Sequence, residues 1–513
     1  MLLGGGLRLA ALADKSLWMD EAFSVRAAQY PLPALWELLA RIDHHPPLYY
    51  ALLHGWMALF GDGEAAARSF SALAATLAIP LFYGAARRLA GPKVALVAGL
   101  TLAVAPFHVR YAQEARMYAL LLLAAAGALY ATVAMLCERS EPARRPPLRL
   151  WLGLVVAQSA AMWSHNAAAV LLPLALNGGV GVPWFMGRAR PAWQTLPGLR
   201  RPGFGRRWLA AQAMALLLWA PWAGSFLHQA QVVDREFWVQ APGAKGVYFL
   251  FRLFAVGDLP EWTGPGAVGV GLLLALAALG AWRWRQQADR LWLLLSLAMV
   301  PPLVELAVSL RRPIFHPPSL IWASLPLYLL AAVGWWALLE GRLPARMPRP
   351  ASRRLAALAG ATLALLWALG LYGYFARFEK EPWDLAAATV AAKAQPGDLV
   401  LFNAPWSQLP FDYYLPDRTL PLDRHGVPAE LFTWDRVAPR MSEAALPALD
   451  ALVEGRSQVW LVYAHTWYTD PDGLIPQALA RRFEQVEHTT AGPIQVHRYH
   501  TPAAAPPAAA VTP

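Results

Sequence analysis

Two adjacent carboxylates, Asp20 and Glu21, stand near the start of the chain, just after a short apolar stretch. Acidic side chains close to a membrane boundary are costly unless they face water, a cation or a substrate. A carboxylate within hydrogen-bond reach of a hydroxyl can take its proton while a new bond forms, so this pair is a candidate general base. The alternative is a water-facing helix N-terminus, where acids interact favourably with the helix dipole.

A second hydrophilic segment, residues 107–118, separates two apolar runs. It contains Tyr111, Gln113, Glu114 and Arg116, although a turn between two spans needs only residues such as Gly, Asn or Ser. Charges at a membrane edge are costly, which favours a functional role for Glu114 and Arg116. A guanidinium can form paired hydrogen bonds with an anionic group, so Arg116 is a candidate substrate-binding residue. The alternative for Arg116 is an aqueous anchor for the following span.

Three further basic residues belong to the same predicted face of the membrane. His45 precedes two prolines, Arg68 lies at the outer end of an apolar run, and His165 lies in a short turn. His165 is a candidate hydrogen-bond donor to a substrate, with a solvated loop histidine as the alternative. Arg68 is a candidate partner of Glu64 or of the carboxylates of Asp20 and Glu21. The alternative is an anchor whose charged end reaches the membrane surface.

The composition is that of a polytopic membrane protein. Of 513 residues, 57% are hydrophobic and 15% are charged, and the mean hydropathy is +0.34. A soluble domain carries about a quarter charged residues. The net charge is +11, but the basic residues lie in short loops between apolar runs, which argues against nucleic acid as a partner. Cys137 is the only cysteine, which excludes an internal disulfide and a cysteine-based metal site.

Eleven apolar runs are candidates for membrane-spanning helices, the first of them short. Another run, Leu48 to Phe60, is too short to cross and is predicted to be an interfacial or re-entrant helix in the first outer loop. This choice places most basic loop residues on one side, which the positive-inside rule makes cytoplasmic. The outer side then receives the candidate site, the loop at 228–262 and the tail after Phe375. The runs are residues 1–13, 69–86, 94–106, 118–136, 150–163, 167–185, 208–226, 264–282, 291–310, 319–339 and 355–375.

The chain after residue 375 becomes more polar. Its pattern predicts buried strands at 398–402 and 459–463, helices at 382–393 and 475–483, and a turn at Gly492-Pro493 between two short strands. We therefore expect three parts: a membrane domain at 1–375, a small extracytoplasmic α/β domain at 376–500, and a disordered Ala/Pro-rich tail at 501–513. The sequence shows no internal repeat, P-loop or Rossmann fingerprint.

Three motifs occur in order on the predicted outer face: Ser-Leu-Trp-Met-Asp-Glu-Ala-Phe-Ser at 16–24, His-Pro-Pro-Leu-Tyr-Tyr at 45–50, and Gln-Glu-Ala-Arg-Met-Tyr at 113–118. With them the chain resembles the family 39 glycosyltransferases, which include protein O-mannosyltransferases and the lipid A aminoarabinose transferase. The resemblance is strong over residues 16–130 and weaker but collinear to 375. In the tail it continues through Glu-Pro-Trp-Asp at 381–384 and Pro-Phe-Asp-Tyr-Tyr at 410–414. It implies a mainly α, GT-C-like bundle of about eleven transmembrane helices.

The resemblance also implies roles for individual residues. Asp20 is the expected general base, Glu21 lies beside it, and Glu114 completes an acidic site. The family often has an Arg-Tyr pair in the region that here reads Ile-Phe-His-Pro-Pro-Ser at 314–319, and the arginine is missing. Arg311, Arg312 or His316 would have to replace that phosphate contact. The residues expected to bind substrate are Arg116, His165, His45, Tyr111, Gln113 and Arg68.

The sequence therefore predicts a membrane glycosyltransferase. It would move a hexosyl or pentosyl group from a polyprenyl-phosphate carrier to an extracytoplasmic protein hydroxyl, lipid or cell-envelope glycan, by an inverting single displacement. With Glu114 as nucleophile the reaction would instead be retaining. Acidic pairs also bind divalent cations, so a metal at Asp20, Glu21 and Glu114 stays open, and no other cofactor is expected. The alternative class is a transporter or lipid-linked sugar flippase, which typically shows inverted repeats and mid-span charges. Here the spans are nearly free of acids, with Glu305 as the unexplained exception.

Overall fold

The computed structural model describes residues 1–138, 146–187, 190–233, 243–258, 263–343, 347–433 and 440–502. The chain divides into two compact units. Unit 1 consists of Met1–Leu12, Pro31–Ala40 and His44–Phe378, and unit 2 consists of Ala13–Tyr30, Arg41–Asp43 and the chain from Glu379 onward. Parts of the predicted outer loop at 228–262, and nearly all of the predicted disordered tail, lie outside the described residues.

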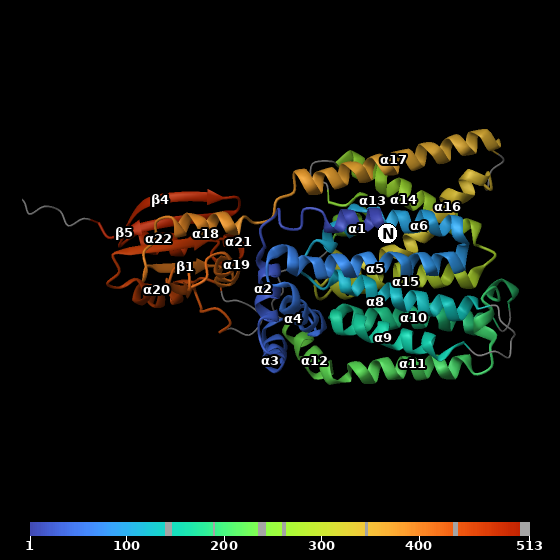
Figure 1. Cartoon of the computed structure of the whole chain (residues 1–513), viewed down its shortest axis with the longest axis horizontal. Coiled ribbons are helices and arrows are strands. Elements are labelled where there is room, and N and C mark those ends of the chain that lie inside the picture. The colour runs from blue at the N-terminus through green and yellow to red at the C-terminus, as the bar shows by residue number, and fades with distance from the viewer. Residues whose placement is uncertain are drawn as a thin grey trace, which may run out of the picture. The chain divides into compact units, whose positions relative to one another are not determined.

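Unit 1 is helical. Because a bilayer offers no water to satisfy backbone N–H and C=O groups, apolar segments become helices that bond internally. Within this bundle α5 packs on α8, α8 on α9, α10 on α15, and α14 on α16 (Figure 1). The helices of unit 1 are α1 Leu2–Leu9, α3 Leu32–Ile42, α4 Leu48–Phe60, α5 Glu64–Ala90, α6 Pro92–Val104, α7 Pro106–Ala112, α8 Tyr118–Cys137, α9 Leu148–Ser164, α10 Asn166–Met186, α11 Phe204–Trp219, α12 Ala223–Val233, α13 Ala244–Val256, α14 Thr263–Arg283, α15 Ala288–Ser309, α16 Ser324–Glu340 and α17 Arg349–Ala376, with 3-10 turns η1 Pro191–Trp193, η2 Pro197–Arg200, η3 Ala220–Trp222 and η4 Pro317–Ala323.

The predicted count of about eleven spanning helices is not confirmed. Within the described ranges, eight helices are long and apolar enough to cross a membrane, or nine if the bent pair α6 and α7 counts as one span. The first predicted run forms only α1, whose eight residues reach about 12 Å, far less than a bilayer core of about 30 Å. The run at 150–163 forms α9, whose 17 residues are fewer than the about 20 that a spanning helix typically has.

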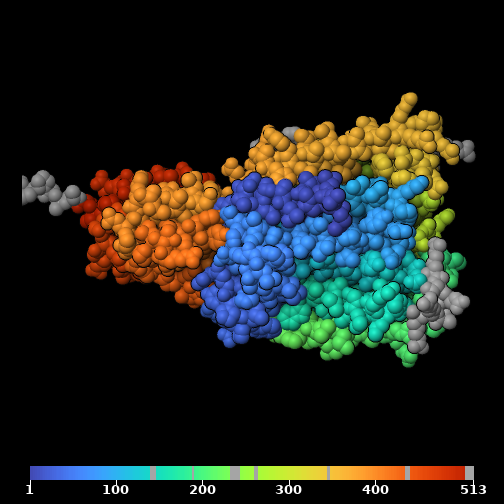
Figure 2. All heavy atoms as spheres, viewed as in Figure 1, coloured from blue at the N-terminus to red at the C-terminus, as the bar shows by residue number. Residues whose placement is uncertain are grey.

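The helical segment is interrupted between α6 and α7, and the two helix axes differ in direction by 53°. Pro106 opens α7, and a proline has no N–H to continue the hydrogen bonds of the preceding helix. The helix α4 has the predicted bounds and 13 residues, while its interfacial position stays a prediction. The short α1 lies against α5 and α6 on the face of unit 1 that Figure 2 shows.

The helices α14 and α16 approach each other closely because both present glycine at the contact. A Cβ added at Gly334 would clash with the backbone carbonyl of Leu276, and one added at Gly280 would clash with that of Leu330. Small residues of this kind let helix backbones meet in a membrane, where packing replaces the hydrophobic effect as the driving force.

Unit 2 contains a five-stranded sheet in the order β2-β1-β3-β5-β4. The strands β1, β2 and β3 are parallel, while β5 pairs antiparallel with both β3 and β4. The predicted strands, helices and the Gly492 turn of this α/β domain are confirmed. The elements of unit 2 are α2 Met19–Ala28, α18 Trp383–Ala391, β1 Leu399–Asn403, the 3-10 turn η5 Pro405–Ser407, α19 Gln408–Tyr414, β2 Asp423–Gly426, the 3-10 turn η6 Glu443–Ala445, α20 Leu446–Val453, β3 Gln458–Tyr463, α21 Thr466–Thr469, α22 Leu474–Ala480, β4 Glu484–Ala491 and β5 Ile494–His500.

Both faces of this sheet are buried, because alternate residues of a strand point to opposite faces. Val400 and Trp460 pack with Trp383 of α18 in one cluster, whereas Leu401 and Leu461 belong to a second cluster. Every residue of β1 is buried. This two-sided burial explains why β1 and β3 appear in the sequence as continuous apolar runs rather than alternating ones.

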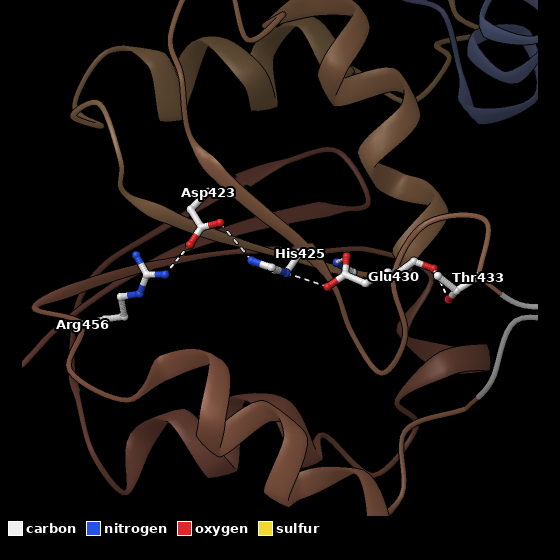
Figure 3. Close-up of polar contacts among 6 residues, drawn as sticks. Asp423, His425, Glu430, Thr433 and Arg456 are labelled. Carbon is white, nitrogen blue, oxygen red and sulfur yellow. Dashed lines mark hydrogen bonds and ion pairs between the residues drawn. The ribbon is translucent and has the colours of Figure 1, made fainter.

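A charged cluster surrounds His425 on the edge strand β2 (Figure 3). The ring nitrogens lie 2.6 Å from Glu430 Oε1 and 2.9 Å from Asp423 Oδ1, and Arg456 donates to the second oxygen of Asp423. Burial alone lowers the pKa of His425, but the hydrogen bonds and charges of Glu430 and Asp423 raise it overall. The contact between His425 and Glu430, which holds the loop after β2, is therefore strongest while His425 is protonated.

Candidate active site

The hydrophilic segment between α7 and α8 is buried in unit 1. The residues Glu114 and Arg116 are only 2% and 4% exposed. Arg110 Nε lies 3.6 Å from Glu114 Oε1, and Arg110 Nη1 donates to Asp258 Oδ2 over 3.0 Å. Buried charges require partners, and Arg110 places a cation beside both Glu114 and Asp258.

The side chain of Arg116 meets the second motif of the sequence. Its Nη1 donates to the Tyr50 hydroxyl of α4 at 3.4 Å. The Arg116 carbonyl accepts a hydrogen bond from Ser71 Oγ at 3.2 Å, and Ser71 is in turn 3.0 Å from the Tyr49 hydroxyl. The two tyrosines of the His-Pro-Pro-Leu-Tyr-Tyr motif thus fix the backbone and the guanidinium of Arg116.

A chain of rings continues from this arginine. The centroids of His45 and His165 are 5.1 Å apart, His165 and Tyr118 are 6.1 Å apart, and Tyr118 and His316 are 5.9 Å apart. Burial, followed by the charges of His45 and Arg116, lowers the pKa of His316 to about 3. His316 is therefore neutral at physiological pH and offers a hydrogen bond rather than a full charge.

Glu305, which the sequence left unexplained, supports this histidine. Its two carboxylate oxygens accept hydrogen bonds from Ser319 Oγ at 2.8 Å and from the backbone N–H of His316 at 3.4 Å. Of the three residues expected to replace the missing arginine, His316 joins the ring cluster, whereas Arg311 and Arg312 are exposed. The acid in α15 thus fixes the turn that presents His316.

Three other predicted substrate-binding residues make structural contacts. Gln113 Nε2 donates to the carbonyl of Ala10 at 2.6 Å and to those of two residues in α1, and Arg68 Nη1 donates to Leu12 O at 2.7 Å. Tyr111 packs edge-on against Tyr118, with ring centroids 5.3 Å apart. These contacts hold the N-terminal segment and α7, so a direct role for the three residues in binding substrate stays a prediction.

Asp20 and Glu21 lie in the first turn of α2, within unit 2. Asp20 is partly exposed, and Glu21 is buried beside Lys380, whose Nζ lies 2.7 Å from Glu21 Oε2. Glu114 belongs to unit 1, so a common site for the three acids stays a prediction. In the part of the chain that the structure describes, no three His, Cys, Asp or Glu side chains gather as a metal site would require.

Sequence reasoning missed several residues of these networks. The sequence patterns assign no individual role to Tyr50, Asp258 or Lys380. Lys380 pairs with a residue 359 positions away, so no local pattern could reveal it. The one available signal was a basic residue next to the Glu-Pro-Trp-Asp motif at 381–384.

Comparison with known sequences supports the resemblance that the motifs indicated. Residues 44–180 match the family described as dolichyl-phosphate-mannose-protein mannosyltransferase. This segment contains the His-Pro-Pro-Leu-Tyr-Tyr motif, the segment between α7 and α8, and His165. No curated protein gives a significant match to the sequence.

Solved structures match over nearly the whole chain. ArnT from Cupriavidus metallidurans in the apo state superposes with a TM-score of 0.60 at 17% identity, over 96% of this chain and 95% of that one. Its structure bound to undecaprenyl phosphate gives 0.60 and 17%, over 97% and 96%. The apo oligosaccharyltransferase of Archaeoglobus fulgidus gives 0.56 and 11%, over 93% and 71%. The predicted GT-C-like fold, and the resemblance to membrane glycosyltransferases, are confirmed.

Proposed function

We propose that the chain transfers a sugar from a polyprenyl-phosphate carrier to an acceptor on the extracytoplasmic side of a cell membrane. The observation that carries this proposal is the buried Arg116, held by Tyr50 and adjoining the cluster of His45, His165 and His316. The fold supports it, because ArnT, which this fold matches along nearly its whole length, has been solved with undecaprenyl phosphate. Polyprenyl phosphate is therefore the carrier we assign.

In this proposal the cluster around Arg116 binds the phosphate of the donor. A guanidinium forms two parallel hydrogen bonds with phosphate oxygens, and a buried one acts in a low dielectric where its charge is poorly screened. The neutral ring of His316 adds a hydrogen bond and takes the place of the missing arginine. Together they stabilise the negative charge that grows on the phosphate as the sugar leaves.

The reaction is a single displacement at the anomeric carbon. An acceptor hydroxyl oxygen forms a bond to that carbon, while the bond to the phosphate oxygen breaks and its electron pair leaves with the polyprenyl phosphate. Asp20 accepts the hydroxyl proton as general base, and the configuration inverts. Glu114 already has Arg110 as a charged neighbour at 3.6 Å, which suits an electrostatic role better than that of a nucleophile.

The alternative of a transporter or flippase has no supporting observation. Glu305, the acid within an apolar run, is occupied by Ser319 and by the backbone of His316. The acceptor class is a protein hydroxyl, a lipid or a cell-envelope glycan, and the transferred group is a hexosyl or pentosyl unit.

The test uses purified full-length protein, radiolabelled polyprenyl-phosphate sugars and a membrane extract as acceptor. Wild-type protein should transfer label, while Asp20→Asn should abolish transfer and leave the fold intact. If Asp20→Asn and Glu114→Gln both retain full turnover, the site assignment is wrong. A reporter fused after Phe375 should report an extracytoplasmic tail, and a cytoplasmic signal would contradict the assigned orientation.

A further inference from the structure

The helix α2, which carries Asp20, is built into the same unit as the C-terminal sheet. The backbone N–H of Leu17 donates to the Tyr414 hydroxyl of α19 over 2.7 Å. Further along α2 the ring of Phe23 meets that of Phe432 edge-on, with centroids 6.4 Å apart. Although these partners are separated by about 400 positions of sequence, α2 is therefore held as an element of the C-terminal domain.

A third attachment of α2 is an ion pair. Lys380 Nζ lies 2.7 Å from Glu21 Oε2, and the two side chains are 3% and 0% exposed. Lys380 lies in the short connection between the end of α17 at Ala376 and the start of α18 at Trp383. A carboxylate buried this deeply stays ionised only when an opposite charge and good hydrogen-bond geometry accompany it.

We propose that Lys380 is a positioning residue that holds Glu21 and thereby leaves Asp20 as the acting base. Consecutive residues of a helix point about 100° apart, so the two carboxylates face different directions. Glu21 turns towards Lys380, whereas Asp20 is partly exposed. This inference rests on the proposed function and refines it, because Glu21 becomes the anchor of the catalytic turn rather than a second base.

The pairing also matters for the charge of the turn. Two neighbouring carboxylates repel each other, and that repulsion favours protonation of one of them. The ammonium of Lys380 offsets the charge of Glu21, which reduces the repulsion within the turn. Charged groups in this connection include Glu379, which precedes Lys380, and Glu381, whose carboxylate is shared by Trp383 and His465, and α19, which packs on α2, contributes Asp412.

The test compares full-length Lys380→Met and Lys380→Arg with wild type. In Lys380→Met we expect kcat to fall by about a hundredfold, with the KM for the donor nearly unchanged, because a small displacement of a catalytic group has an effect of this size. The acidic limb of its pH–rate profile should move up by about one pH unit, because the turn has lost a neighbouring cation. Lys380→Arg keeps the charge and should restore most of the activity and the wild-type profile.

A second readout does not depend on activity. Hydrogen exchange of the amides in Met19–Ala28 should be faster in Lys380→Met than in wild type and should return towards wild type in Lys380→Arg. If folded Lys380→Met keeps the wild-type pH profile and the wild-type exchange of α2, the proposal is overturned. Absence of transfer by the wild-type protein would refute the proposed function instead, and the exchange measurement would still decide whether Lys380 holds α2.

Discussion

The role of Arg116 in binding the donor phosphate gives the sharpest quantitative prediction. Its guanidinium is buried at 4% exposure beside Tyr50, so it meets a ligand in a poorly screened environment. A hydrogen bond to a charged group contributes about 1.5–3 kcal/mol, which corresponds to about 10- to 150-fold in affinity, so Arg116→Met, which loses two such bonds, should weaken binding of the phosphate by at least this factor. The affinity of Arg116→Lys for the phosphate should lie between those of wild type and Arg116→Met, because an ammonium keeps the charge but lacks the planar fork of a guanidinium.

The assay is equilibrium binding of labelled undecaprenyl phosphate to detergent-solubilised protein, with undecaprenol, which lacks the phosphate, as the control ligand. Tyr50→Phe is the comparison variant, because it removes the hydroxyl that accepts from Arg116 but keeps the guanidinium and its charge. It should change the affinity by no more than about tenfold. Folded Arg116→Met that binds undecaprenyl phosphate as tightly as wild type would refute the assignment of this arginine.

Two further predictions concern the stability of each unit. Gly334→Ala should lower the thermal unfolding temperature, because the added Cβ would clash with the carbonyl of Leu276 and cost about 1–3 kcal/mol of stability. Gly271→Ala is the control, because Gly271 lies on α14 with no atom near its Cβ position, and it should be neutral or stabilising. Equal effects of the two substitutions would contradict the close approach of α14 and α16. In unit 2 the raised pKa of His425 means that its pairing stabilises the folded state below the pKa of an unfolded histidine and is lost as the pH rises through the folded pKa. His425→Gln should therefore lose more stability at pH 5.5 than at pH 9, and a pH-independent loss would count against the charged cluster.

Local patterns predicted the elements of this protein better than their number. The thirteen residues of α4 and the buried strands β1 and β3 could be predicted because hydropathy and residue type report burial directly. The count of about eleven spans is not confirmed at α1 and α9, since an apolar composition does not fix where a helix ends. Caps and tertiary contacts decide those ends.

The candidate site was predictable in its residue types and less so in its partners. Arg116 could be predicted as a site residue because a charge in a turn between two membrane spans is costly. In the structure its side chain is buried. The same cost applied to Glu305, but its role appeared only with its contacts to Ser319 and His316. The pairing of Glu21 with Lys380 joins opposite ends of the chain, which periodicity and local composition cannot report.

The most direct test of the central claim follows both products of one reaction. Purified protein is given a doubly labelled polyprenyl-phosphate sugar with the acceptor extract, and free polyprenyl phosphate and acceptor-bound sugar are counted together. Wild type should release one carrier for each sugar transferred, and Asp20→Asn should lower both rates about a thousandfold. Carrier and sugar that stay joined in wild type, or equal rates in the two proteins, would contradict the claim that Asp20 drives transfer from a lipid phosphate.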